Sequence, residues 1–142
     1  MSDEPLRPDP DRLLQHTAAP HRGKLKVFFG ACAGVGKTWA MLAEAQRLRA
    51  QGLDILIGVA ETHGRKETAA MLQGLSTLPP RRLAHRGRYV YEFDLDAALA
   101  RRPALILVDE LAHSNAPGSR HPKRWQDVDE LLEAGIDVFT TV

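Results

Sequence analysis

The residues best suited to chemistry lie between positions 31 and 38, where the sequence reads Ala-Cys-Ala-Gly-Val-Gly-Lys-Thr. This stretch matches the phosphate-loop pattern, with alanine at the first position instead of the usual glycine. Glycines in such a loop let successive backbone N–H groups point at phosphate oxygens, and the following helix directs its positive dipole end at the same anion. Lys37 would add a positive charge for the β- and γ-phosphates, and the Thr38 hydroxyl could bind Mg²⁺. The predicted nucleotide-binding residues here are Ala31, Cys32, Ala33, Gly34, Val35, Gly36, Lys37, Thr38 and Trp39.

A second signal is the acidic pair Asp109-Glu110, which directly follows an apolar run at 104–108. Asp109 is predicted to hold Mg²⁺ together with Thr38, usually through a water in such proteins. Glu110 is the candidate general base, and with Lys37 it forms the predicted catalytic pair. Glu61 also follows an apolar run and could replace Glu110 as the base. The alternative interpretation is a solvated strand end for Glu110 and an ordinary polar loop for Glu61.

The nucleotide itself is expected to be ATP, bound with Mg²⁺. No Asn-Lys-x-Asp motif for reading guanine is present, and Asp109 is not followed by the x-x-Gly of GTPases. Both absences favour ATP over GTP.

The pattern of apolar and helical segments predicts the elements that must position these residues. Strands are expected at 25–29, 55–59, 104–108 and 136–142, with a weaker one at 89–93, and helices at 38–50, 66–75, 94–99 and 123–134. Strands that are apolar on both faces and alternate with helices predict an α/β fold. We expect a P-loop NTPase-like parallel sheet of about five strands with helices on both faces. Right-handed crossovers would bring all carboxyl ends, including Thr140 and Thr141, to one edge.

Length and composition indicate one globular domain preceded by an arm. The chain has 142 residues, 44% hydrophobic and 26% charged, and a net charge of +1. Four prolines predict that residues 1–23 form an extended N-terminal arm, with 11–17 as its one short helical stretch, and that 24–142 form the nucleotide-binding domain. The single cysteine excludes an internal disulfide, and no apolar run approaches the ~20 residues of a membrane helix. We therefore expect a cytoplasmic domain.

Several weaker features have plainer interpretations. The basic segment 119–124 is expected to be a solvated turn, although it could supply a charge to the γ-phosphate or dock another domain. A basic cluster is interpreted as an exposed loop; its members are Arg81, Arg82, His85, Arg86 and Arg88. The helical spacing of Trp39 and Trp125 favours core positions over ligand platforms. The histidines lack zinc-site spacing.

These motifs, taken together, resemble the N-terminal cytoplasmic domain of the KdpD family of potassium-responsive sensor histidine kinases. The segments that carry the resemblance are 7–11, 30–38, Glu61-Thr62-His63-Gly64-Arg65, Asp109-Glu110-Leu111-Ala112-His113, 115–120 and 123–127. The stretches at 61–65 and 111–120 are far more specific than the phosphate loop, and the resemblance extends over essentially the whole chain.

The resemblance implies a function that the spacing of residues does not show. Members of the family are membrane-anchored homodimeric kinases that pair with a response regulator controlling potassium uptake. Their N-terminal ATP-binding region regulates the balance between kinase and phosphatase activities. The chain ends at Val142, before the universal-stress-like domain, the membrane helices, the phospho-acceptor helix and the kinase ATP-binding domain. It is therefore expected to be a fragment without histidine autophosphorylation, located at the cytoplasmic side of the inner membrane in the full-length protein.

Three functions follow as hypotheses. The first is a regulatory ATP-binding module that contacts downstream domains of the same kinase. The second is an ATPase or a phosphotransferase acting on serine or threonine, with Glu110 as base. The third and weakest is an interaction module for protein or nucleic acid that uses the basic residues 81–88, because the near-zero net charge does not favour nucleic acid.

Overall fold

A computed structural model describes residues 22–30 and 36–142. The predicted helical stretch 11–17 and the arm as far as residue 21 lie outside the described residues. The same is true of five predicted nucleotide-binding residues, Ala31, Cys32, Ala33, Gly34 and Val35.

The centre of the fold is a five-stranded parallel sheet with the strand order β1-β7-β6-β2-β3. Its strands are β1 (Leu25–Phe28), β2 (Ile55–Val59), β3 (Ser76–Thr77), β6 (Leu105–Val108) and β7 (Asp137–Thr141). In the middle of the sheet, Ile106 is in register with Leu56 on one side and Val138 on the other. The predicted α/β fold with a parallel sheet of five strands is confirmed.

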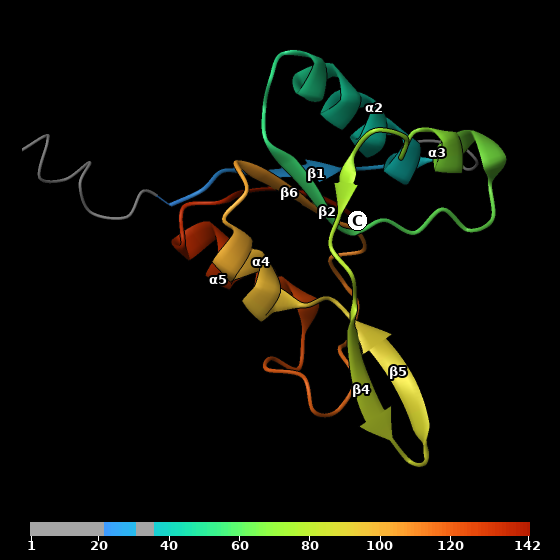
Figure 1. Ribbon diagram of the computed structural model, residues 1–142, viewed down its shortest axis with the longest axis vertical. Coiled ribbons are helices and arrows are strands. Elements are labelled where there is room, and N and C mark those ends of the chain that lie inside the picture. Colours follow the sequence, from blue (N-terminus) through green and yellow to red (C-terminus); the bar gives the residue numbers. More distant parts are fainter. Residues whose placement is uncertain (1–21, 31–35) are drawn as a thin grey trace, which may run out of the picture.

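Helices cover both faces of this sheet (Figure 1). On one face lie α2 (Lys37–Ala50) and α3 (Lys66–Ala70), and on the other lie α4 (Leu95–Arg101) and α5 (Arg124–Glu133). Successive residues of β6 pack on opposite faces: Leu105 and Leu107 join the cluster under α2, while Ile106 and Val108 join the cluster with α4 and α5. Because both faces are buried, the strand has no polar position, which explains its continuous apolar sequence.

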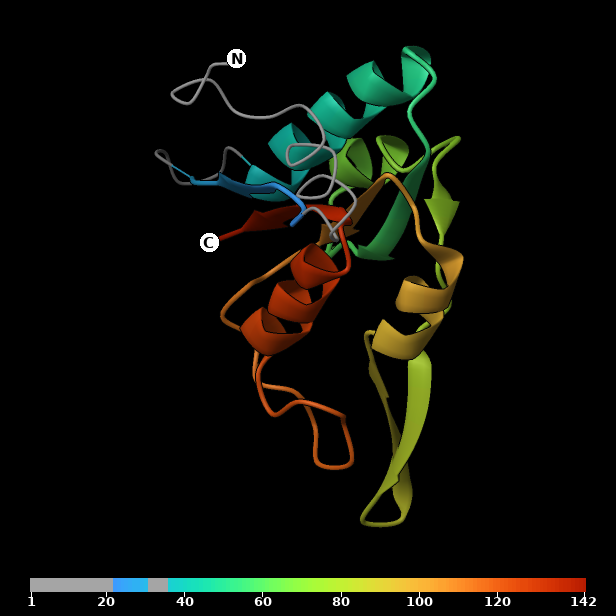
Figure 2. The ribbon, with the colours of Figure 1, turned by 90° about the vertical axis from the view of Figure 1, so that its left-hand side faces the viewer.

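A two-stranded antiparallel hairpin extends away from the main sheet (Figures 1 and 2). It consists of β4 (Arg81–His85) and β5 (Arg88–Glu92), joined by a two-residue turn. Arg86 and Gly87 have φ values of 51° and 74°. Two successive positive φ values are typical of the hairpin turn whose twist matches its strands.

The hairpin corrects two predictions. The strand expected at 89–93 exists as β5, but it pairs with β4 and not with the parallel sheet. The fifth place in the sheet belongs to β3, which has only two residues and therefore no periodicity that a sequence pattern could reveal. The interpretation of the arginines at 81–88 as an exposed loop is also wrong, because they lie on and between two strands.

The helices lie at the predicted places, but α3 ends at Ala70 and not at residue 75, because the chain continues as turns at 71–74. Asp94 caps α4 as expected, since its side chain accepts a hydrogen bond from the Ala97 amide at 3.1 Å. The prediction of core positions for Trp39 and Trp125 is wrong: their exposed fractions are 42% and 54%. Neither tryptophan belongs to the buried face of its helix. In α2, for example, that buried face contains Met41. Among the described residues, no helix is long and apolar enough to cross a membrane.

Candidate functional site

The carboxylate of Asp109 lies at the centre of the candidate site, immediately after β6, and is fully buried. Its Oδ2 atom accepts hydrogen bonds from Thr38 Oγ1 at 2.8 Å and from the Glu61 amide at 2.9 Å. Its Oδ1 atom accepts from the Glu110 amide at 3.1 Å and from the hydroxyl of Thr141. One side chain therefore joins the carboxyl ends of β2, β6 and β7 to the first turn of α2.

Lys37 lies at the same edge, where β1 and β7 end. Its Nζ atom donates a hydrogen bond to the carbonyl oxygen of Val142 at 2.8 Å. Its aliphatic stem passes close to Gly30, since a Cβ atom at Gly30 would lie 2.8 Å from Lys37 Cγ. A residue without a side chain is thus needed at Gly30 for the lysine to reach the strand ends in this way.

Both candidate bases face one imidazole at the open side of the edge. His63 Nε2 lies 3.6 Å from Glu110 Oε2, and His63 Nδ1 lies 4.0 Å from Glu61 Oε1. The backbones of His63 and Glu110 have φ values of 53° and 61°. Residues with a Cβ rarely adopt this left-handed conformation, and such strain concentrates at functional sites.

The oxygen donors of this site fit a hard cation such as Mg²⁺. Thr38 gives its hydroxyl proton to Asp109, so that the lone pairs of Thr38 Oγ1 stay free for a metal. Each oxygen of Asp109 already accepts two hydrogen bonds, which suits a contact with the metal through water. Within residues 22–30 and 36–142, no three His, Cys, Asp or Glu side chains gather as a metal site.

Sequence reasoning missed the role of Arg124, which was expected in a solvated basic turn. Its exposed fraction is 4%, and its Nη1 atom donates to the carbonyl oxygen of Asp109 at 2.8 Å. Burial lowers the pKa of Arg124, while the neighbouring carboxylates, Glu92 first among them, act to raise it. No local pattern signals this burial, because the partners of the guanidinium lie on β5 and after β6.

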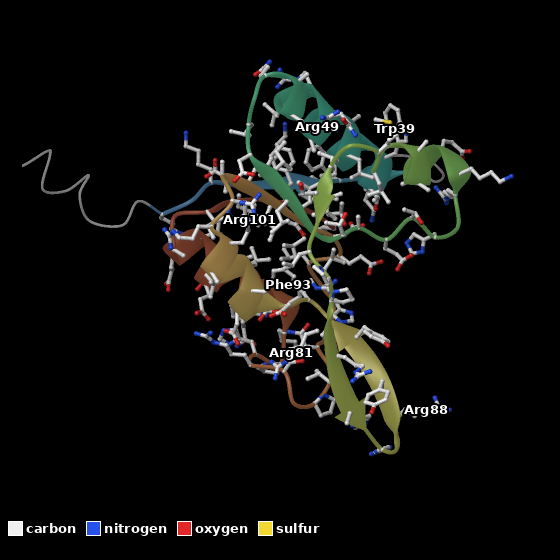
Figure 3. The ribbon with its side chains drawn as sticks, in the orientation of Figure 1. Trp39, Arg49, Arg81, Arg88, Phe93 and Arg101 are labelled. Carbon is white, nitrogen blue, oxygen red and sulfur yellow. The ribbon has the colours of Figure 1, made fainter. Side chains whose placement is uncertain are left out.

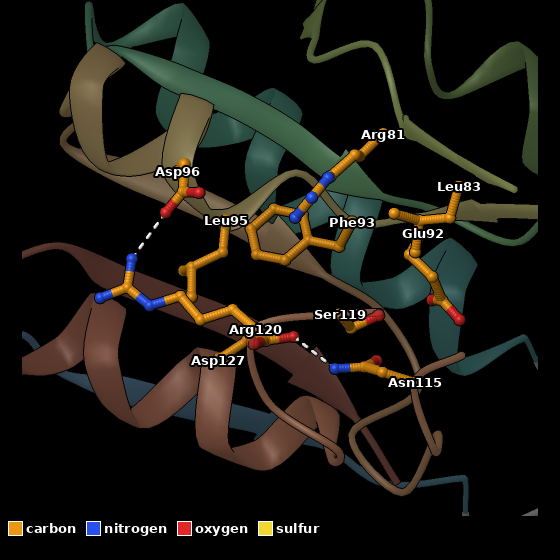
Figure 4. A pocket seen from close by; sticks show the side chains of 10 residues that line it. All are labelled: Arg81, Leu83, Glu92, Phe93, Leu95, Asp96, Asn115, Ser119, Arg120 and Asp127. Atoms are coloured by element: carbon orange, nitrogen blue, oxygen red, sulfur yellow. Dashed lines mark hydrogen bonds and ion pairs between the residues drawn. The ribbon is translucent and has the colours of Figure 1, made fainter. Parts of the chain in front are cut away.

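Two other members of the basic segment, Arg120 and His121, form ion pairs although Arg120 is exposed; Figure 4 shows the pair of Arg120 with Asp96. Arg120 forms ion pairs with Asp96 of α4, at 2.6 Å, and with Glu130 of α5. His121 Nε2 lies 2.8 Å from Glu130 Oε1. The segment therefore fastens the loop before α5 to two helices.

The arginines of the hairpin lie on a projecting ribbon, on which Figure 3 labels Arg81 and Arg88. The Arg82 guanidinium lies 4.3 Å from the centre of the Tyr89 ring, and the exposed fractions of Tyr89 and Tyr91 are 60% and 62%. None of these side chains lies among the partners of Asp109.

Comparison with known proteins gives a family for the chain. The family model described as "KdpD: Osmosensitive K+ channel His kinase sensor domain" matches residues 21–142. "Sensor protein KdpD" of Escherichia coli K12 is 85% identical over 142 residues, all of this chain and 16% of the relative. "Sensor protein KdpD" of Mycobacterium tuberculosis H37Rv is 51% identical over 130 residues, 92% of this chain and 15% of the relative. That of Clostridium acetobutylicum is 50% identical over 140 residues, 96% of this chain and 16% of the relative.

The chain thus spans about a sixth of the length of these relatives. The match extends over the whole described region, including the strand ends that meet at Asp109. The resemblance predicted from the motifs is confirmed, and the chain belongs to the KdpD family of sensor-kinase domains.

Proposed function

We propose that the chain is the ATP-binding regulatory domain of a KdpD-type two-component sensor kinase that controls potassium uptake. The observation that carries the proposal is the contact between Thr38 Oγ1 and Asp109 Oδ2 at 2.8 Å, which joins the end of the phosphate-loop motif to the acidic end of β6. The names of the relatives support the sensor role. The proposal includes a cytoplasmic location, contacts with downstream domains, a homodimeric full-length protein and a response regulator as partner.

Each residue of the edge has a part in holding ATP and Mg²⁺. Lys37 would turn its ammonium from the Val142 carbonyl to the β- and γ-phosphates, and Thr38 would bind the metal through its free lone pairs. Asp109 would orient the metal's water ligands. Bound Mg²⁺ supplies charge neutralisation for the phosphates. A regulatory effect requires only that ATP binds one conformation of the kinase more tightly than another, by about 1–3 kcal/mol.

The test is ATP–Mg²⁺ binding by the double variant Lys37→Ala, Thr38→Ala, measured by calorimetry. We expect the affinity to fall at least about tenfold, which corresponds to about 1.4 kcal/mol. The matched control is Lys26→Ala, which removes an exposed lysine of β1 that has no contact with Asp109. Unchanged binding by the double variant would show that the site is wrongly assigned.

A second function, ATP hydrolysis or phosphoryl transfer to a protein serine or threonine, is favoured by the strained backbone of Glu110, with φ at 61°. A site that only binds ATP does not need a carboxylate fixed in this way. Glu110 would accept the proton of the attacking water or hydroxyl. The γ-phosphoryl group would move to that oxygen, and ADP would leave.

Radiolabelled ATP separates the two functions. If chemistry occurs, Glu110→Gln should reduce phosphate release or label transfer by about 10²–10⁴-fold and leave ATP binding intact. Glu61→Gln, on the opposite side of His63, is the matched comparison and identifies the base if it has the larger effect. Normal binding without any release or transfer would leave regulation as the function.

A further inference from the structure

The guanidinium of Arg124 holds the backbone turn that follows β6. Its Nη1 atom donates to the carbonyl oxygen of Asp109 at 2.8 Å and lies 3.4 Å from that of Glu110. The backbone amide of Arg124 also donates to the carbonyl oxygen of His113 at 3.1 Å. The first residue of α5 is therefore tied to the strained segment that carries both acidic residues of the site.

The other side of the guanidinium faces the base of the hairpin. Arg124 Nη2 lies 3.7 Å from Oε1 of Glu92, the last residue of β5. Glu92 in turn accepts the amide of Ala116 at 2.7 Å and lies 2.9 Å from His113 Nε2. A continuous series of polar contacts thus runs from the Asp109 backbone to the hairpin and to the loop before α5.

The burial of this ion pair is costly, which suggests a role besides stability. Arg124 and Glu92 have exposed fractions of 4% and 9%. Removing two charges from water can cost more free energy than their attraction returns, and apolar residues often replace such pairs without loss of stability. Within the described part of the chain, Arg124 Nε has no hydrogen-bond partner, so the terminal nitrogens make the contacts of this guanidinium.

We propose that Arg124 and Glu92 link the ATP site to the hairpin and the 113–116 loop, so that occupancy of the site changes the conformation at Glu92. The inference rests on the proposed function. When ATP–Mg²⁺ engages Thr38, the threonine keeps its hydrogen bond to Asp109 and moves toward the metal, so that Asp109 and the peptide that follows it shift with Thr38. Arg124 is a positioning residue here, because it acts through the backbone of Asp109 and not on the nucleotide.

Two backbone amides report the two ends of the link in nuclear magnetic resonance spectra of the 142-residue chain. The Thr38 amide reports ligand binding, and the Ala116 amide, bonded to Glu92, reports the far end. We expect ATP–Mg²⁺ to shift both signals with the same midpoint in the unaltered chain. In Arg124→Met, we expect ATP–Mg²⁺ still to shift the Thr38 amide signal but no longer to shift the Ala116 amide signal.

Further variants separate coupling from a loss of structure. Arg124→Lys keeps the positive charge without the two-sided guanidinium and should give an intermediate Ala116 shift. Glu92→Gln removes the charge at the hairpin end of the link and should reduce the Ala116 shift. This variant tests the link even if Arg124→Met does not fold. Arg101→Met is the matched control, because it removes an exposed arginine paired with Asp54, a residue that precedes β2 at the opposite edge of the sheet. Its Ala116 shift should equal that of the unaltered chain.

The outcomes distinguish the link from the function on which it rests. A Thr38 shift without an Ala116 response in the unaltered chain overturns the link alone. The link is also overturned if Ala116 responds equally in Arg124→Met, or in Glu92→Gln where that variant is used. If ATP–Mg²⁺ moves neither signal, the proposed ATP site is wrong and the link falls with it.

Discussion

Two adjacent threonines at the end of β7 have different surroundings although both are buried. The Thr141 hydroxyl donates to Asp109 and accepts the Glu110 amide at 3.0 Å. The Thr140 hydroxyl has no hydrogen-bond partner among the residues that the structure describes. Because alternate residues of a strand face opposite sides of the sheet, only one of the two can reach the carboxylate. The pair therefore allows a matched test of what the Asp109 contacts contribute.

We expect Thr141→Val to lower the free energy of unfolding by about 1–3 kcal/mol, because buried Asp109 loses a donor and the Glu110 amide loses an acceptor. Thr140→Val should leave stability unchanged or raise it, since an unpaired hydroxyl is replaced by a methyl group of similar size. Urea denaturation of both variants measures the difference. Equal losses of stability in the two would contradict the hydrogen-bond assignment.

At the scale of elements, α5 is fastened to the preceding loop by a buried carboxylate. Asp127, in the first turn of α5, accepts a hydrogen bond from Asn115 Nδ2 at 2.8 Å. Burial raises the pKa of Asp127 more than this hydrogen bond and the nearby His121 and Arg124 lower it, and Glu130 adds to the rise. The folded chain therefore binds a proton at Asp127 more tightly than the unfolded chain does.

This difference gives a pH dependence of stability with a definite sign. The pKa of Asp127 is about 3.9 in the unfolded chain and higher in the folded chain. As the pH rises through this interval, ionisation of Asp127 therefore lowers the free energy of unfolding. Asp127→Asn keeps the acceptor for Asn115 and removes the charge, so its stability relative to the unaltered chain should increase with pH. Urea denaturation between pH 4 and 7 measures this.

The control for that experiment is Asp129→Asn, which removes a half-exposed carboxylate of the same helix. It supplies the effect of losing one negative charge near the surface. If the relative stability of Asp127→Asn falls as the pH rises, the buried carboxylate does not act as described.

At the scale of the whole molecule, positive and negative charges are nearly balanced and largely interspersed. The net charge is +1, and several arginines are paired, including Arg101 with Asp54 and Arg120 with Asp96. The hairpin that carries Arg81, Arg82 and Arg88 is a narrow two-stranded ribbon (Figures 1 and 2). Binding to the phosphate backbone of DNA depends on many such cations acting together.

We therefore expect no measurable binding of the chain to duplex DNA at physiological salt and at chain concentrations up to about 10 µM. Fluorescence anisotropy of a labelled duplex measures this, with a range of salt concentrations as the internal control. Saturable binding that weakens steeply with salt would restore nucleic acid as a partner of the hairpin.

Most of the architecture could be predicted because its signals are local. The apolar run before Asp109 and the Gly-Lys-Thr at the start of α2 indicate a strand and a helix from neighbouring residues alone. The two-residue β3 has no such signal. The exposure of Trp39 was mispredicted because spacing shows which residues share a face of a helix, but not which face the sheet covers.

The sequence by itself determined the alternation of buried strands and amphipathic helices, the family, and the residue types at the strand ends. Only the tertiary structure decided that Thr38, Glu61 and Thr141 all bond to Asp109, and that Arg124 is buried between Asp109 and Glu92. The physical reason is that these contacts depend on the order of strands in the sheet. That order is set by how the helices cover both faces, and no short stretch of sequence contains it.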